Sequence, residues 1–221
     1  MSSAARLGAR SGYAVVLVGV AYLIVLVAGM VRHGFSEPIG DPILAVMEVL
    51  TILSALPILA LFVALHASVA PDGRPWATLA LSFAAMFCCA TTGVHVVELT
   101  AGRALARPGL VWPSVPYAVE LFAWDFLLGV ALLLAAQALP RDRRARRLRA
   151  WLRATGALCL IGLLGPLMGN MRIQLIGVVG YAVLLPIVAW LLAGWLRAPG
   201  PTHFLERPPH DQTQADPRPF R

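Results

Sequence analysis

Residues 43–69, ILAVMEVLTILSALPILALFVALHASV, determine the class of protein to which this chain belongs. The stretch is longer than the ~20 mainly apolar residues that a helix needs to cross a lipid bilayer. Its only ionisable side chains are Glu48 and His66. Five further apolar stretches of similar length occur along the chain, at residues 13–31, 76–98, 117–139, 150–169 and 173–196. The sequence therefore predicts an all-α fold, a polytopic transmembrane helical bundle with six spans.

The composition of the 221-residue chain also indicates a membrane environment. Hydrophobic residues make up 59% of it and charged residues 13%, against roughly 25% charged residues in an average soluble domain. So few polar side chains cannot cover a globule in water, and we expect membrane lipid to surround much of the protein. The formal net charge of +7 does not indicate nucleic acid binding, because the basic residues flank the apolar stretches.

The arginines predict how the helices are oriented. All 18 basic residues are arginine, and 14 of them fall on the side that holds both termini if the chain crosses the membrane six times. An excess of basic residues marks the cytoplasmic side of a membrane protein. We therefore expect both termini in the cytoplasm and the protein in a bacterial inner membrane. The four arginines on the opposite side are Arg32, Arg103, Arg107 and Arg172.

The chain is predicted to contain one folded domain and two flanking segments. Residues 1–12 are expected to form a cytoplasmic N-terminal segment, and residues 13–197 the six-helix transmembrane domain. Residues 198–221 are rich in proline and polar residues, and such a composition cannot bury enough apolar area to order itself. This last segment is predicted to be a disordered cytoplasmic tail.

Five ionisable residues lie inside the predicted spans and are the candidate site residues: Glu48, His95, Glu98, Glu120 and Asp125. An ionisable side chain in hydrocarbon costs several kcal/mol unless it faces protein or water, so each one indicates a functional site. The predicted orientation places all five in the outer half of the bilayer. At 1.5 Å per residue, Glu48 lies ~7 Å and Asp125 ~12 Å below the outer boundary. Together they predict a polar pocket that faces outward.

The predicted third span carries a polar stripe that should face the inside of the bundle. Cys88, Thr91, Thr92, His95 and Glu98 follow the helical spacing i, i+3, i+4, i+7 and i+10. Simple interhelical hydrogen bonding would explain such a stripe equally well. Structural explanations also exist for the acids, since Glu98 and Glu120 can reach headgroup water and Asp125 can pair with Arg172 or His95.

No metal or cofactor is expected from the sequence. Cys88, Cys89 and Cys159 lie in apolar stretches without a CxxC motif, so they indicate neither a disulfide framework nor a redox centre. Di-iron bundles use two Glu-x-x-His pairs, whereas His95 and Glu98 form a single pair in the reversed order.

Two further patterns concern packing and access to the pocket. Gly162, Gly165 and Gly169 form a small-residue face, which Gly177 and Gly180 are expected to complement in close helix packing. The segment WPSVP, residues 112–116, is stiff and apolar. It is expected either to fold over the pocket as a lid or to anchor the chain at the membrane interface.

TTGVHVVEL (91–99), taken together with WPSVPYAVELFAWDF (112–126), resembles a pattern found in uncharacterised bacterial polytopic membrane proteins. The resemblance covers most of residues 13–197. It implies a six-span bundle in the membrane and implies no activity.

Three functions remain open from the sequence. We favour a non-catalytic or accessory membrane protein in which the acids are structural. The first alternative is an intramembrane enzyme acting on a lipid-like or isoprenoid substrate, with Asp125 as the acid, His95 and Glu98 as a base pair, and Glu48 or Glu120 orienting the substrate. The second alternative is a carrier of protons or small solutes with Asp125 as its gate. Protein partners and the identity of a lipid-like or small-molecule ligand cannot be predicted.

Overall fold

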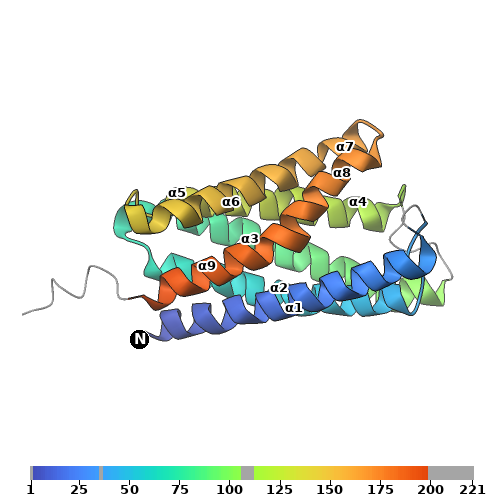
Figure 1. Cartoon of the computed structure of the whole chain (residues 1–221), viewed down its shortest axis with the longest axis horizontal. Helices are drawn as coiled ribbons and strands as arrows, with labels where there is room; N and C mark the ends of the chain where they lie inside the picture. The colour runs from blue at the N-terminus through green and yellow to red at the C-terminus, as the bar shows by residue number, and fades with distance from the viewer. Residues whose placement is uncertain (1, 35–36, 106–111, 199–221) are drawn as a thin grey trace, which may run out of the picture.

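The computed structural model describes residues 2–34, 37–105 and 112–198, and this part of the chain contains helices and no strand. Six helical rods are long enough and apolar enough to cross a membrane, which confirms the predicted all-α bundle and indicates an integral, multi-pass membrane protein. The rods run antiparallel along one another (Figure 1). They span Ser3–His33, Ile43–Ser68, Pro71–Gly102, Val115–Ala138, Arg143–Leu167 and Met171–Arg197.

Several rods consist of more than one helical element. The first two are the α-helices α1 (Ser3–His33) and α2 (Ile43–Ser68). The third contains η1 (Pro71–Gly73), α3 (Arg74–Val97) and η2 (Glu98–Gly102), and the fourth contains α4 (Val115–Leu121), η3 (Phe122–Leu128) and α5 (Gly129–Ala138). The last two contain α6 (Arg143–Gly162), α7 (Leu164–Leu167), α8 (Met171–Val178), η4 (Val179–Leu184) and α9 (Leu185–Arg197).

Two rods begin earlier than the apolar pattern indicated, because side chains cap them. The Ser2 hydroxyl accepts a hydrogen bond from the backbone N–H of Ala5 at 3.2 Å, so residues 3–12 are the first turns of α1. Asp142 accepts one from the N–H of Ala145 at 2.7 Å and starts α6 within the arginine cluster. Such caps satisfy backbone donors that the first turn of a helix leaves free. The predicted disordered tail lies outside the described residues from residue 199 onward.

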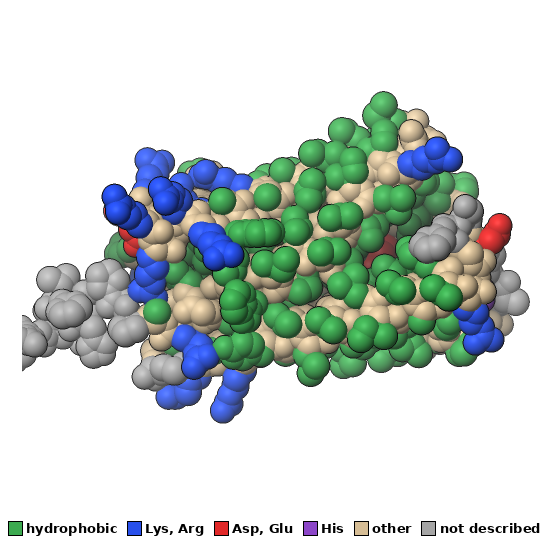
Figure 2. All heavy atoms as spheres, in the orientation of Figure 1, with side chains coloured by type: hydrophobic (Ala, Val, Ile, Leu, Met, Phe, Trp, Pro, Cys, Tyr) green, Lys and Arg blue, Asp and Glu red, His purple; other side chains and the backbone are tan. Residues whose placement is uncertain are grey.

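The core of the bundle is apolar, and its outer surface is apolar as well. Phe87, Ile58 and Leu128 have no more than 1% of their surface exposed. On the outside, Leu17 is 73% exposed and Leu56 70%, and green hydrophobic side chains cover the middle of the face seen in Figure 2. A surface of this kind is suited to contact with lipid tails.

Arginines gather at one end of the bundle. Figure 2 shows most of the blue side chains of this face at the end where α1 begins, and few at the opposite end. We call these the arginine-rich end and the far end. The far end is the one at which α1 finishes and α2 starts.

The predicted glycine packing is confirmed in part. A Cβ added to Gly162 would lie 2.6 Å from the Cα of Gly177, and one added to Gly165 would lie 2.6 Å from the backbone nitrogen of Gln174. The backbones of α6–α7 and α8 therefore approach as closely as glycine allows. The expectation for Gly169 was wrong, because this residue forms the turn before α8 with φ +66° and has open space around it.

Three rods contain a widened π-helical segment, which the sequence did not reveal. These segments are η2, η3 and η4, and they carry Glu98, Asp125 and Tyr181 respectively. Each π turn inserts an extra residue and redirects the side chains that follow, and such turns are frequent at functional sites.

Candidate functional site

A cavity of about 470 Å³ opens among α1, α2, α4, α8 and η4. Most of its walls are apolar, with Val18 and Leu26 from α1 and Leu175 and Val178 from α8 among them. Figure 2 shows a hollow on this face between α1 and α8, with an acidic side chain visible inside it. The volume lies in the range of roughly 300–1,000 Å³ that is typical of small-molecule sites.

The cavity reaches the side of the bundle because α1 and the last rod diverge. At the arginine-rich end α1 packs closely against α9, whereas α8 leaves α1 toward the far end (Figure 1). The opening therefore lies on the surface that the exposed hydrophobic side chains assign to lipid.

One polar cluster in the wall is built around the carboxylate of Glu120 in α4. His95 Nε2 lies 2.9 Å from Glu120 Oε1, and the Thr91 hydroxyl donates to both carboxylate oxygens at 3.1 and 3.0 Å. Trp124 Nε1 donates in turn to the Thr91 oxygen at 3.0 Å. The chain of contacts joins α3 to α4 and η3 and fixes the His95 ring.

These contacts determine the tautomer of a neutral His95. A carboxylate only accepts hydrogen bonds, so the nitrogen that faces Glu120 must carry the hydrogen. The other nitrogen, Nδ1, then presents a lone pair. Nδ1 is buried and has no hydrogen-bond partner among the described residues.

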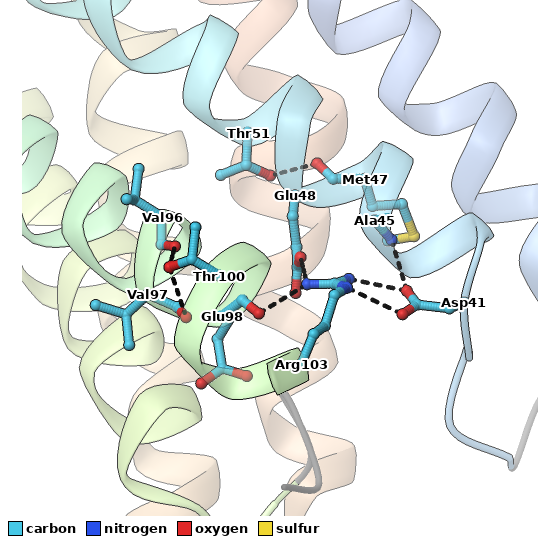
Figure 3. A network of polar contacts seen from close by, with 10 residues as sticks. All are labelled: Asp41, Ala45, Met47, Glu48, Thr51, Val96, Val97, Glu98, Thr100 and Arg103. Atoms are coloured by element: carbon cyan, nitrogen blue, oxygen red, sulfur yellow. Dashed lines mark hydrogen bonds and ion pairs between the residues drawn. The ribbon is translucent and has the colours of Figure 1, made fainter. Parts of the chain in front are cut away.

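A second polar cluster at the far end is built around Arg103, directly after η2 (Figure 3). Its Nε and Nη2 donate to the two carboxylate oxygens of Asp41 at 2.9 and 2.8 Å. Its Nη1 donates to Glu48 Oε2 at 2.7 Å and to the backbone oxygen of Glu98 at 2.9 Å. We call Asp41, Glu48 and Arg103 the arginine clasp. It holds the end of α3 against the start of α2.

The electrostatics of the clasp follow from its geometry. Hydrogen bonds and the positive charge of Arg103 lower the pKa of Asp41 below its usual value. The two carboxylates raise the pKa of Arg103, chiefly through the hydrogen bonds with Asp41, so the guanidinium remains charged. A paired arginine also offsets the cost of burying Glu48, which is 1% exposed.

Only one of the two carboxylate oxygens of Glu48 is hydrogen-bonded in the arginine clasp. Its Oε1 is buried and has no hydrogen-bond partner among the described residues, while the side chain lines the cavity. Buried polar atoms are nearly always paired in folded proteins, so such an atom calls for an explanation.

Asp125 lies away from the cavity. It is fully buried in η3, and a Cβ added to Gly177 or Gly162 would contact its Oδ1, so the two glycines make room for the carboxylate. Neither of its oxygens has a hydrogen-bond partner within bonding distance in the described part of the chain. The amide of Gln174 lies beside the carboxylate, but its nitrogen donates to the Tyr181 hydroxyl at 3.0 Å.

The ion pairs that were expected for Asp125 are not formed. Asp125 pairs with neither His95 nor Arg172, since His95 is bound to Glu120 and Arg172 is exposed. Glu98 and Glu120 are largely enclosed by protein. Glu98 is 5% exposed and folds back over Gly102, and the Glu120 side chain is 13% exposed.

The structure thus brings three of the five candidate residues to one cavity. Glu48, His95 and Glu120 line it, while Glu98 and Asp125 are not among its lining residues. Apart from Trp112 in the predicted lid, the aromatic side chains that complete the wall were not expected from the sequence, and Arg103 was expected only to mark orientation. The aromatic lining residues are Tyr22, Trp112, Tyr117, Trp124 and Tyr181.

The position of Trp112 agrees with the predicted lid more than with the predicted interface anchor. Trp112 lines the cavity and packs edge-on against Tyr117 with ring centroids 6.4 Å apart. Residues 106–111, which precede it, lie outside the described residues.

Among the described residues no group of three or more His, Cys, Asp or Glu side chains is arranged to hold a metal ion. Cys88 and Cys159 are buried free thiols and Cys89 is exposed. No protein-family model, curated protein or solved structure matches this chain significantly. The resemblance to uncharacterised bacterial six-span proteins therefore stays a prediction.

Proposed function

We propose that this protein is a bacterial inner-membrane protein that binds a lipid-like, amphipathic molecule in the cavity between α1 and α8. The observation that carries the proposal is a cavity with apolar walls, a polar end at Glu48 and His95, and a hollow toward the lipid-facing side. A molecule with an apolar body and a small polar head matches this division. A non-catalytic binding role accounts for all of these features.

The proposed orientation rests on the arginines. The excess of 14 to 4 supports an orientation with the arginine-rich end in the cytoplasm and the polar end of the cavity toward the periplasm. Reporter fusions test this independently of binding. A fusion after Arg197 should be active only as a cytoplasmic reporter, and one between Arg103 and Trp112 only as a periplasmic reporter.

The sideways opening favours a ligand that arrives from the bilayer. The cavity is lined by Val18, Tyr22 and Leu26 on α1 and by Leu175 and Val178 on α8. A free ion or a strongly polar solute would lose its hydration on passing such walls, at a cost of several kcal/mol. An amphipathic molecule that is already in the membrane loses little hydration on entering the cavity.

A second candidate function, an intramembrane acid/base enzyme, is favoured by the His95–Glu120 pair. A histidine that is oriented by a carboxylate, with its other nitrogen free, is a common arrangement for a general base. His95 Nδ1 would take a proton from the ligand head, and Glu48 would orient that head. Asp125 and Glu98 would not touch the substrate, because they lie outside the cavity wall.

The carrier function draws no support from the described residues. A carrier needs a polar route to the arginine-rich end. The space next to the cavity in that direction holds only about 10 Å³ and is lined by apolar residues, among them Ile58, Leu132 and Leu185.

Filling the cavity tests the binding function. Val178 lines the cavity, and its neighbour Val179 is 48% exposed on the outside of the same rod. Val178→Trp should weaken binding of a fluorescent single-chain lipid analogue by tenfold or more, which corresponds to about 1.4 kcal/mol. Val179→Trp is the matched control and should leave binding unchanged. Equal binding by both variants would contradict the proposal.

A further inference from the structure

Two buried hydrogen-bond acceptors of the cavity wall are left unpaired in the described part of the chain. Glu48 Oε1 and His95 Nδ1 are buried, have no partner among the described residues, and belong to side chains that line the cavity. The other carboxylate oxygen of Glu48 is occupied by Arg103, and the other nitrogen of His95 faces Glu120. A ligand can satisfy both free atoms only by donating hydrogen bonds to them.

The charge of the cavity wall favours a cation. Glu37, Glu48 and Glu120 line the cavity, and no arginine is among the described residues that do so. The nearby Arg103 is shared between Glu48 and Asp41, so one positive charge offsets two negative ones in the clasp. An anionic head would approach these carboxylates in a region of low dielectric constant, where charge repulsion is strong.

Aromatic rings add to this preference. Five of the described residues that line the cavity are aromatic, and Trp124 and Tyr181 pack against each other with ring centroids 5.0 Å apart. The faces of such rings attract ammonium groups. Quaternary ammonium would gain this attraction too, but it has no N–H and would leave both acceptor atoms unsatisfied.

We propose that the ligand is a single-chain amphipath with a primary ammonium head, whose N–H groups donate to Glu48 Oε1 and His95 Nδ1. Its tail lies between α1 and α8. This inference rests on the proposed binding function and adds the chemical class of the ligand. The cavity volume suits one alkyl chain with its head rather than a much larger lipid.

A series of ligands that share one dodecyl chain tests the proposal on the full-length protein in detergent micelles near neutral pH. Dodecylamine should bind at least about tenfold more tightly than dodecanol or dodecyltrimethylammonium, a difference of about 1.4 kcal/mol, and dodecanoate should bind most weakly. Lysophosphatidylethanolamine carries a primary ammonium group in a headgroup that also contains a phosphate. Its affinity therefore shows whether the ammonium group of a phospholipid can bind in the cavity.

Glu48→Gln should remove the preference for the amine over the alcohol. Arg103 would keep the amide oxygen, so an N–H donor without negative charge would replace the free acceptor Oε1. Asp72→Asn, which removes one negative charge in η1 at the arginine-rich end, is the matched control. The wild-type series decides the question even if Glu48→Gln does not fold.

The outcomes separate the two proposals. Binding of no member of the series would contradict the binding function itself. Binding that is equal for all heads, or strongest for dodecanoate, would overturn the ammonium assignment and leave the binding function standing.

Discussion

Arg103 Nη1 donates to Glu48 Oε2 at 2.7 Å, which joins the end of the third rod to the second turn of α2. The contact crosses 55 positions of sequence and reaches one of the most buried carboxylates of the described chain. Because Arg103 approaches from the far end and takes only one oxygen, it offsets part of the charge of Glu48 and leaves the second oxygen for the cavity. The clasp thereby ties the stability of the bundle to the chemistry of the cavity.

Arg103→Gln should destabilise the protein by about 3 kcal/mol, because it leaves the Glu48 charge buried without its partner. Adding Glu48→Gln should recover a large part of this loss, since the double variant buries no unpaired charge. Unfolding of purified protein by titration with a denaturing detergent measures both variants. Arg172→Gln is the control, as Arg172 is exposed on the same side of the protein. A double variant that is as unstable as the sum of its single variants would contradict this coupling.

Asp41 should make the protein less stable in acid. Its folded pKa is lowered by Arg103, so its contribution to stability is full above the unfolded pKa of about 3.9 and is lost as the pH falls through the lower folded value. The melting temperature should therefore decline below about pH 4. Asp41→Asn should flatten part of that decline and Asp72→Asn should not. The effect should be small, because the Asp41 side chain is 50% exposed.

Gly177→Ala should destabilise the bundle by about 1–3 kcal/mol, because the new methyl group would overlap the carboxylate of Asp125. Gly194→Ala is the control. Its methyl group meets nothing within 4 Å, and alanine favours the helix by about 1 kcal/mol. Combining Gly177→Ala with Asp125→Ala should relieve much of the strain. Thermal unfolding measures the set, and equal stability of the two glycine variants would argue against the close fit.

His95 should hold its hydrogen on Nε2 near neutral pH, because Glu120 accepts it there. Nitrogen NMR of protein labelled at histidine distinguishes this tautomer from the alternative and from imidazolium. Glu120→Gln should release the constraint and produce a mixture of tautomers. A wild-type signal with the hydrogen on Nδ1 would remove one of the two acceptor atoms on which the ammonium assignment depends.

The six-span fold was predictable because long apolar stretches are unfavourable in water, and in a bilayer they form helices that cross it. The involvement of Glu48, His95 and Glu120 was predictable for a related reason, since an ionisable side chain in a span must turn inward. The spacing of Glu120 and Asp125 agrees with their separation in the structure. Five positions correspond to about 140° around a helix, and the structure turns one toward the cavity and the other toward Gly162 and Gly177.

The rest of the site depends on tertiary contacts that a linear pattern does not contain. Asp41 and Arg103 are 62 positions apart, and both lie outside the apolar stretches, so nothing in the sequence paired them. The π turns at Glu98 and Asp125 redirect side chains without any recognised sequence signal. The cavity itself lies where α8 diverges from α1, while α8 packs closely against α6 at Gly162 and Gly177.

The most direct test of the account is an experimental structure of the protein in lipid nanodiscs with dodecylamine bound. We expect the ligand nitrogen to lie within about 3 Å of both Glu48 Oε1 and His95 Nδ1, with the alkyl chain leaving between α1 and α8. A nitrogen that stays at the bilayer surface, or side chains of α1 and α8 that close the cavity, would contradict the account.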